Sequence, residues 1–111
     1  MSAVPARRRP AERDAADAEV PPWPRDVSRK PEMKISEVVD RLKAEFPALS
    51  LSKVRYLEGE GLIAPFRVGN GYRRYSQADV ERLRYTLTAQ RDEYLPLSVI
   101  RQRLAELDAS P

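Results

Sequence analysis

The 111-residue sequence contains neither cysteine nor histidine. Without thiols the chain has no disulfide, no thiolate metal site and no cysteine nucleophile, and without imidazoles it has no histidine ligand and no Ser-His or Cys-His pair. Its serines and carboxylates fall into no catalytic motif. The sequence therefore predicts a protein that is not an enzyme, with no catalytic residue, no metal site and no cofactor.

Long hydrophobic runs are absent as well. No apolar stretch approaches the ~20 residues of a membrane-spanning helix, and the N-terminus lacks the apolar region of a secretory signal peptide. We therefore expect a cytoplasmic protein that does not contact a membrane.

Glycine is scarce, with four residues, whereas six of the ten prolines fall in residues 1–32. This segment has no helical or alternating apolar period and cannot bury enough surface to offset the entropy lost on ordering. We expect a disordered, Pro/Arg-rich tail in which the arginines at 7–9 stay solvated. Trp23, its one large apolar side chain, either docks on a partner or packs on the folded domain. That domain is expected to span residues 33–108, followed by a short C-terminal end at 109–111.

Apolar residues recur at helical spacing from Met33 onward, which predicts a first helix ended by Pro47. A second helix is expected to begin near Ser50 or Ser52, either of which can cap it, and to end at Gly61. Two short helices with a tight connection are typical of a helix-turn-helix. The inward positions of the second helix are predicted to be Leu51, Val54 and Leu57.

A β-hairpin is expected next. The Asn-Gly pair at 70–71 separates two runs of β-favouring residues, 65–68 and 72–75, and both turn residues tolerate positive φ. Ser76 and Asp79 then resemble a capping box that opens a third helix.

The C-terminal part is predicted to hold two helices. The first ends at residues 94–96, Tyr-Leu-Pro, and Ser98 is placed to cap the second. The predicted fold is therefore mainly α, in the order helix–helix–β-hairpin–helix–helix, with a disordered N-terminal tail. The buried positions of the last two helices are predicted to be Val80, Leu83, Leu87, Ile100, Leu104 and Leu107.

Positive charge is concentrated in the second helix and the hairpin. Residues 50–75 contain five basic and two acidic residues, a net charge of +3 that equals that of the whole chain. Arginine and lysine neutralise phosphates, hydroxyl groups fix the register, and the second helix of such a unit lies in the major groove. The pattern therefore predicts binding to double-stranded DNA. The candidate contacts are Ser52, Lys53, Arg55 and Tyr56 on the helix, and Arg67, Tyr72, Arg73 and Arg74 on the hairpin.

Several of these side chains have a structural alternative. Tyr75 is expected to pack on the core, with Tyr72 on the same side of the strand. Arg73 and Arg74 point to opposite faces of a regular strand, so that one of them pairs with an acid such as Glu58 instead of reaching DNA.

Other basic residues fit an ordinary surface equally well. Lys53 and Arg55 suit solvated positions of a helix. In the third helix, surface ion pairs with Glu81 and Asp92 explain the arginines. These arginines are Arg82, Arg84 and Arg91.

Six short motifs follow one another along the chain: 54–58 (VRYLE), 61–63 (GLI), 65–67 (PFR), 71–76 (GYRRYS), 79–83 (DVERL) and 97–101 (LSVIR). Together they resemble the DNA-binding pattern of the MerR family, from about Met33 to Leu107. The resemblance implies a winged helix-turn-helix in which the hairpin is the first wing and the last two helices form the second. Residues 87–97 further resemble the actinobacterial FtsR-like branch, associated with control of cell-division genes.

The resemblance also assigns roles. The second helix becomes the recognition helix, and the hairpin side chains hold the flanking DNA backbone, with Asn70 at the tip. Such regulators bind inverted repeats in promoters as dimers, and they bend and untwist a long spacer so that the polymerase can use both promoter elements. The predicted partners are therefore promoter or operator DNA, a second copy in a homodimer or head-to-tail oligomer, and RNA polymerase, all at the nucleoid.

The chain departs from the family pattern in three places. Leu57 stands where many members have a second tyrosine, and residues 43–49 lengthen the first helix and its turn. The family's long dimerising helix and effector domain do not follow residue 107. We expect the DNA-binding half of a longer regulator for transcription control; a natural short protein is the alternative. Without cysteine, it is not a thiolate metal sensor or an iron–sulfur redox sensor of that family.

Two other functions fit parts of the sequence. An architectural, excisionase-like factor would use the same domain at recombination sites. A protein-interaction module would bind an acidic partner through the basic face, with Trp23 as an additional anchor.

Overall fold

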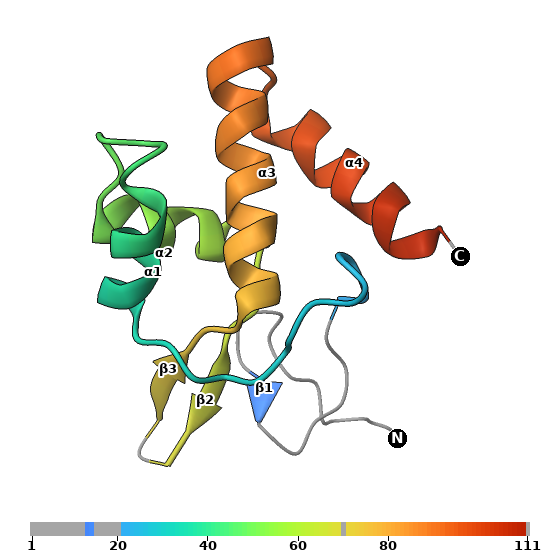
Figure 1. The fold of residues 1–111 in the computed structure, drawn as a ribbon. Coiled ribbons are helices and arrows are strands. Elements are labelled where there is room, and N and C mark those ends of the chain that lie inside the picture. The colour runs from blue at the N-terminus through green and yellow to red at the C-terminus, as the bar shows by residue number, and fades with distance from the viewer. Residues whose placement is uncertain (1–12, 15–20, 70, 111) are drawn as a thin grey trace.

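The computed structural model describes residues 13–14, 21–69 and 71–110. The predicted arginine run at 7–9 and the predicted contact Asn70 lie outside the described residues. The mainly helical fold is confirmed, with two helices, a hairpin and two further helices in the expected order (Figure 1). The elements are β1 (Arg13–Asp14), α1 (Ile35–Leu42), α2 (Leu51–Gly59), β2 (Phe66–Val68), β3 (Tyr72–Arg74), α3 (Gln77–Glu93) and α4 (Leu97–Ala109).

Helix α2 begins and ends where the sequence predicts. The Ser50 hydroxyl accepts a hydrogen bond from the Lys53 amide at 3.2 Å, so Ser50 rather than Ser52 is the N-cap. Gly61 follows the last turn with φ at +85°, a conformation that glycine adopts without strain. Val54 and Leu57 are buried, but the prediction that Leu51 also faces inward is wrong, because this first helical residue is 47% exposed.

The predicted hairpin is confirmed, and we call its two strands and turn, residues 66–74, the wing. Strands β2 and β3 are antiparallel, with Phe66 opposite Arg74 and Val68 opposite Tyr72. The turn carries positive φ values at its glycines, as such a tight connection requires. Strand β1, which the sequence analysis did not predict, pairs with β2 in parallel.

Helix α3 opens with the predicted capping box. The Ser76 hydroxyl accepts from the Asp79 amide at 3.1 Å, and the Asp79 carboxylate accepts from the Ser76 amide at 3.0 Å. The helix ends at Tyr94, whose backbone is left-handed. The prediction that Ser98 caps α4 is wrong. The N-cap is Pro96, because its carbonyl already accepts the first amides of the helix, and Ser98 therefore lies inside the first turn.

A single hydrophobic core surrounds α3. Helices α1 and α2 cover one side of it and α4 the other, with the wing at its lower end (Figure 1). The predicted positions of α3 and α4 are buried, except that Leu107 is only half-buried. No helix in the described part of the chain is both long and apolar enough to cross a membrane.

The packed chain begins before Met33. Residues 21–32, which the sequence analysis assigns to the tail, lie partly against α3 and α4. The Trp23 ring stands edge-on to Tyr85 at a centroid distance of 5.3 Å, so the second alternative for Trp23, packing on the domain, is the one observed. A local pattern could not reveal this, because the partners of Trp23 lie about sixty to eighty-five residues further along the chain.

Candidate nucleic-acid interface

Helix α2 presents a polar face opposite its buried one. Ser52, Arg55 and Tyr56 are exposed, while Lys53 is half-buried with its ammonium 5.7 Å from the centre of the Tyr56 ring. Because Val54 and Leu57 anchor the other side of the helix in the core, these four candidate contacts are held on an outward-facing surface.

The wing divides its candidate contacts between two roles. Tyr72 is 63% exposed, and the Arg74 guanidinium lies 5.9 Å from the centre of its ring. Arg67 instead donates a hydrogen bond to the Gly71 carbonyl at 2.7 Å and so braces the turn. The Tyr72 side chain is thus available to a ligand, whereas Arg67 is engaged within the wing. Arg74 is half-buried, and one of its terminal nitrogens donates to the Arg73 carbonyl at 3.1 Å.

A buried carboxylate connects the wing to α2. Glu58, in the last turn of α2, is only 4% exposed. Its carboxylate accepts from the Arg73 Nε at 2.5 Å and from the Tyr75 hydroxyl at 2.8 Å. The prediction that one of the two neighbouring arginines pairs with Glu58 is confirmed, and that arginine is Arg73.

Tyr75 and Tyr72 lie on opposite sides of the chain, so the prediction that they share a face is wrong. Tyr75 is fully buried, as expected, whereas Tyr72 faces solvent. Side chains of an extended strand alternate, and two positions three residues apart therefore point in opposite directions. Burial raises the pKa of the Tyr75 phenol above its ordinary value, and the charge of Glu58 raises it further. Tyr75 consequently stays a neutral donor to that carboxylate.

These elements enclose an open groove of about 450 Å³ between the start of α1, the middle of α2 and strand β3. None of the described residues that line it is acidic. We call it the basic groove, and its polar lining is Lys34, Arg55, Tyr72, Arg73, Arg74 and Tyr75. A concave surface with four cationic side chains and a tyrosine at its rim suits a phosphate backbone.

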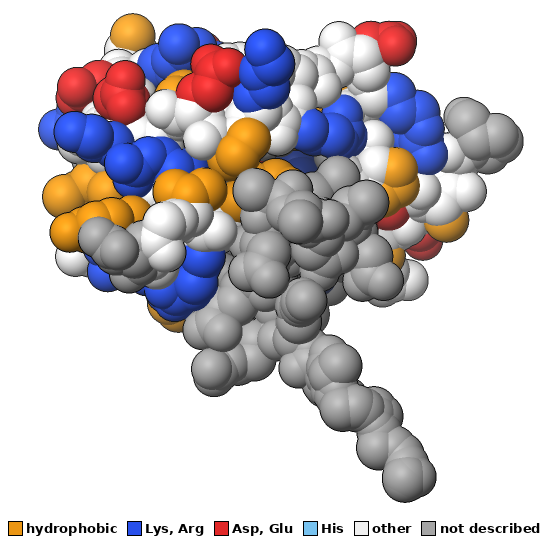
Figure 2. Space-filling view, turned by 90° about the horizontal axis from the view of Figure 1, so that it is seen from below, with side chains coloured by type: hydrophobic (Ala, Val, Ile, Leu, Met, Phe, Trp, Pro, Cys, Tyr) orange, Lys and Arg blue, Asp and Glu red, His pale blue; other side chains and the backbone are white. Residues whose placement is uncertain are grey.

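The lower face of the molecule shows the same distribution of charge. In Figure 2, Lys and Arg side chains on the left of this face lie next to hydrophobic ones, while acidic side chains gather mainly along the upper border. Among the basic residues at 50–75, Arg55 is exposed and Lys53 and Arg74 are half-buried, so this part of the predicted positive excess reaches the surface, whereas Arg73 is paired with Glu58.

The arginines of α3 agree with the prediction in two cases of three. Arg84 pairs with Glu81 and Arg91 pairs with Asp92 on the surface. Arg82 is the exception, because it is 5% exposed and binds neither of the predicted acids. Its carboxylate partner comes from the far end of α4, which sequence spacing along α3 could not indicate.

Comparison with known proteins agrees with this geometry. The family described as MerR HTH family regulatory protein matches residues 33–107, which include α1 to α3, the wing and most of α4. The chain belongs to the MerR family. The predicted family and winged helix-turn-helix fold are thereby confirmed, and the match contains every candidate contact.

The relatives within the MerR match are regulators. The uncharacterized HTH-type transcriptional regulators Rv1828 of Mycobacterium tuberculosis and Mb1859 of Mycobacterium bovis are each 54% identical over 79 residues, 71% of this chain and 31% of theirs. The HTH-type transcriptional regulator HmrR of Rhizobium leguminosarum is 43% identical over 75 residues, 66% of this chain and 52% of its own. The matched part of the chain thus spans about a third of the length of the two mycobacterial relatives and about half of the length of HmrR. Among solved structures, none matches the chain significantly.

Proposed function

We propose that this MerR-family domain binds double-stranded DNA sequence-specifically in transcription control, with α2 in the major groove and the wing on the flanking backbone. The observation that carries the proposal is the basic groove, in which four cationic side chains from α1, α2 and the wing converge without an acidic neighbour in the lining. Phosphate neutralisation by such side chains supplies much of the affinity of DNA-binding proteins.

The exposed face of α2 supplies the specific contacts. Ser52, Arg55 and Tyr56 project from a helix whose other side is fixed in the core, and side chains in the first turns of such a helix reach base edges. Lys53 lies beside the Tyr56 ring, where it adds positive charge next to the exposed face of α2.

The wing supplies the backbone contacts. Arg74 and Tyr72 present a guanidinium and a phenol from neighbouring positions of the wing. Arg73 takes part differently, because its Nε is committed to Glu58 and the terminal nitrogens are the atoms left to meet a phosphate. Arg67 acts through the turn that it braces. The contact predicted for Asn70 stays a prediction.

The greater length of the relatives bears on the domain organisation of the whole regulator. The shared segment is 31% of Rv1828 and 52% of HmrR, which supports the hypothesis that this domain is the DNA-binding half of a longer regulator. We propose a homodimer on an inverted repeat in a promoter, RNA polymerase as the neighbouring partner, and a cytoplasmic location at the nucleoid. The FtsR-like assignment stays a prediction.

Selection of random duplexes by the purified chain near physiological salt tests the proposal. An enriched inverted repeat supports a symmetric pair, whereas an enriched direct repeat supports head-to-tail assembly. Enriched sites outside promoters would instead favour an architectural factor. Absence of enrichment, together with salt-sensitive binding to an acidic protein, would refute sequence-specific DNA binding in favour of a protein-interaction module.

A further inference from the structure

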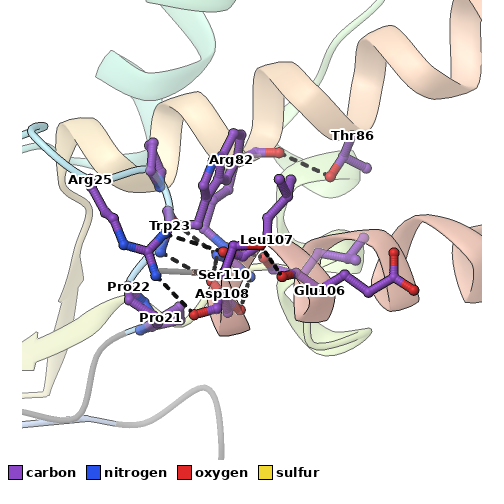
Figure 3. Close-up of polar contacts among 12 residues, drawn as sticks. Pro21, Pro22, Trp23, Arg25, Arg82, Thr86, Glu106, Leu107, Asp108 and Ser110 are labelled. Carbon is purple, nitrogen blue, oxygen red and sulfur yellow. Dashed lines mark hydrogen bonds and ion pairs between the residues drawn. The ribbon is translucent and has the colours of Figure 1, made fainter.

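Arg82 lies buried in the middle of α3 and joins three separate parts of the chain (Figure 3). Its Nε donates to the Leu62 carbonyl, between α2 and β2, at 3.1 Å. One terminal nitrogen donates to the Trp23 carbonyl at 2.8 Å and to the Asp108 carboxylate at 2.7 Å, and the other reaches Asp108 at 3.3 Å. The guanidinium therefore connects the N-terminal segment to the last turn of α4.

The N-terminal segment makes its own contacts with the same turn. The Trp23 amide donates to the Asp108 carboxylate at 3.1 Å. The Arg25 guanidinium donates to the Leu107 and Asp108 carbonyls at 3.2 and 3.0 Å, in the last turn of α4, where the Leu107 carbonyl also accepts from the Ser110 amide at 3.3 Å. A cation at a helix C-terminus satisfies otherwise unpaired carbonyls and opposes the negative end of the helix dipole.

The segment is also held in shape along its length. Arg29 donates to the carbonyls of Pro21, Pro24 and Val27, which closes residues 21–29 into a compact loop. At its other end the Ser28 carbonyl accepts from the Ala78 amide at the start of α3. The loop is thus attached to α3 at Ser28 and at Trp23, and only the attachment at Trp23 also involves α4.

Helix α4 depends on these contacts at its end. Its buried apolar residues are Ile100 and Leu104, and no residue after Leu104 in the described part of α4 is buried. Arg101 binds the Glu60 carbonyl at 2.8 Å and so attaches the first half of α4 to the end of α2. In the last turn, Leu107 is only half-buried against the core. The cluster around Asp108 supplies the polar contacts that attach this turn to α3 and to the N-terminal segment.

We infer that residues 21–29 form a clamp, which docks Trp23 on a site built from Arg82, Tyr85 and Asp108 and thereby fixes the last turn of α4 against α3. Trp23 and Asp108 both lie outside the residues that match the MerR family, 33–107, so the clamp is an addition to that domain. The position of α4 then depends on the N-terminal segment, and any partner that displaces Trp23 also releases the end of α4.

The single tryptophan makes the clamp measurable, because its fluorescence reports only on residue 23. The test variant is Asp108→Ala, and the matched control is Glu106→Ala, which removes the same charge from an exposed position of the same helix. Both substitutions introduce a strong helix former, so any loosening of α4 does not come from helix propensity. The measurements are the Trp23 emission maximum, its quenching by acrylamide, and amide hydrogen exchange along α4.

Asp108→Ala is expected to shift Trp23 emission to the red, to increase quenching, and to raise exchange in the last turn of α4 by about tenfold, since local opening follows the loss of its contacts. Glu106→Ala is expected to change none of these. Trp23→Ala gives the reciprocal test and should raise exchange at the end of α4 while leaving α1 and α2 as protected as before.

Unchanged emission and exchange in Asp108→Ala would overturn the clamp, as would a protected last turn of α4 in Trp23→Ala. If circular dichroism shows that Asp108→Ala is unfolded, Arg25→Ala replaces it, because Arg25 is exposed and its loss leaves the core intact. Faster exchange at the end of α4 in Arg25→Ala supports the clamp, and unchanged exchange there overturns it.

Discussion

Replacement of Glu58 by glutamine tests whether Glu58 affects DNA binding by positioning Arg73 or through its own negative charge. The glutamine keeps the size of the side chain and an acceptor for the Tyr75 hydroxyl, but it removes the negative charge that holds the Arg73 Nε. If long-range electrostatics alone governed DNA binding, loss of a negative charge would strengthen it. If Glu58 positions Arg73 for a phosphate, DNA binding weakens. The two mechanisms therefore predict opposite signs.

The magnitude follows from the burial of the pair. Glu58 is 4% exposed, but the Arg73 side chain is 30% exposed and keeps part of its hydration. The cost in stability should accordingly lie below the ~3–5 kcal/mol of a fully buried broken pair, at about 1–3 kcal/mol. For a domain of this size that lowers the melting temperature by roughly 5–15 °C, so the variant is expected to remain folded at a low assay temperature.

The assay is a double-mutant cycle on DNA affinity. Arg73→Ala should weaken binding and reduce the slope of log affinity against log salt by about 0.9, the value for one phosphate contact. Glu58→Gln should weaken binding about three- to tenfold in the presence of Arg73 and have little further effect in Arg73→Ala, because coupled residues do not act additively. The matched control is Glu60→Gln, which removes a half-buried charge from the same end of α2 and should leave affinity unchanged or slightly higher.

Two results would refute the positioning role of Glu58. One is stronger DNA binding by Glu58→Gln at a temperature where circular dichroism shows a folded chain. The other is an equal loss of affinity with and without Arg73, which would mean that Glu58 acts on the whole fold and not through that arginine.

Other predictions concern the wing, the caps and the core. Arg74→Ala should weaken binding to all duplexes alike and lower the salt slope by about 0.9, as titrations at several salt concentrations would show. Ser76→Ala should cost about 1 kcal/mol in chemical denaturation, whereas Asp79→Asn should cost less, since burial raises the pKa of Asp79 and already disfavours its charged form. Leu57→Ala should cost about 2–5 kcal/mol, but Leu51→Ala, at an exposed position, no more than about 0.5 kcal/mol. Equal losses of stability in Ser76→Ala and Asp79→Asn, or in Leu57→Ala and Leu51→Ala, would contradict the burial from which these predictions follow.

The sequence by itself determined the four helices, the hairpin and their order, but it did not predict strand β1, and α1 ends at Leu42 rather than at the predicted Pro47. Helical periodicity, a serine cap at position 50 or 52, the Asn-Gly turn and the Ser76–Asp79 box are local signals, because the interacting groups lie within a few residues of each other. The concentration of positive charge in residues 50–75 and the linked MerR motifs are likewise readable along the chain. These signals sufficed for the fold class and for the surface on which a DNA site is proposed.

Only the tertiary structure decided which side chains are committed to the interior. Alternation along the strand separates Arg73 from Arg74, but it does not say which of the two meets Glu58. Arg82 and Trp23 find partners that lie far away in sequence, and Asp108 belongs to no motif that points to them. Pairing across such distances depends on how the helices pack together, and no local spacing encodes that packing.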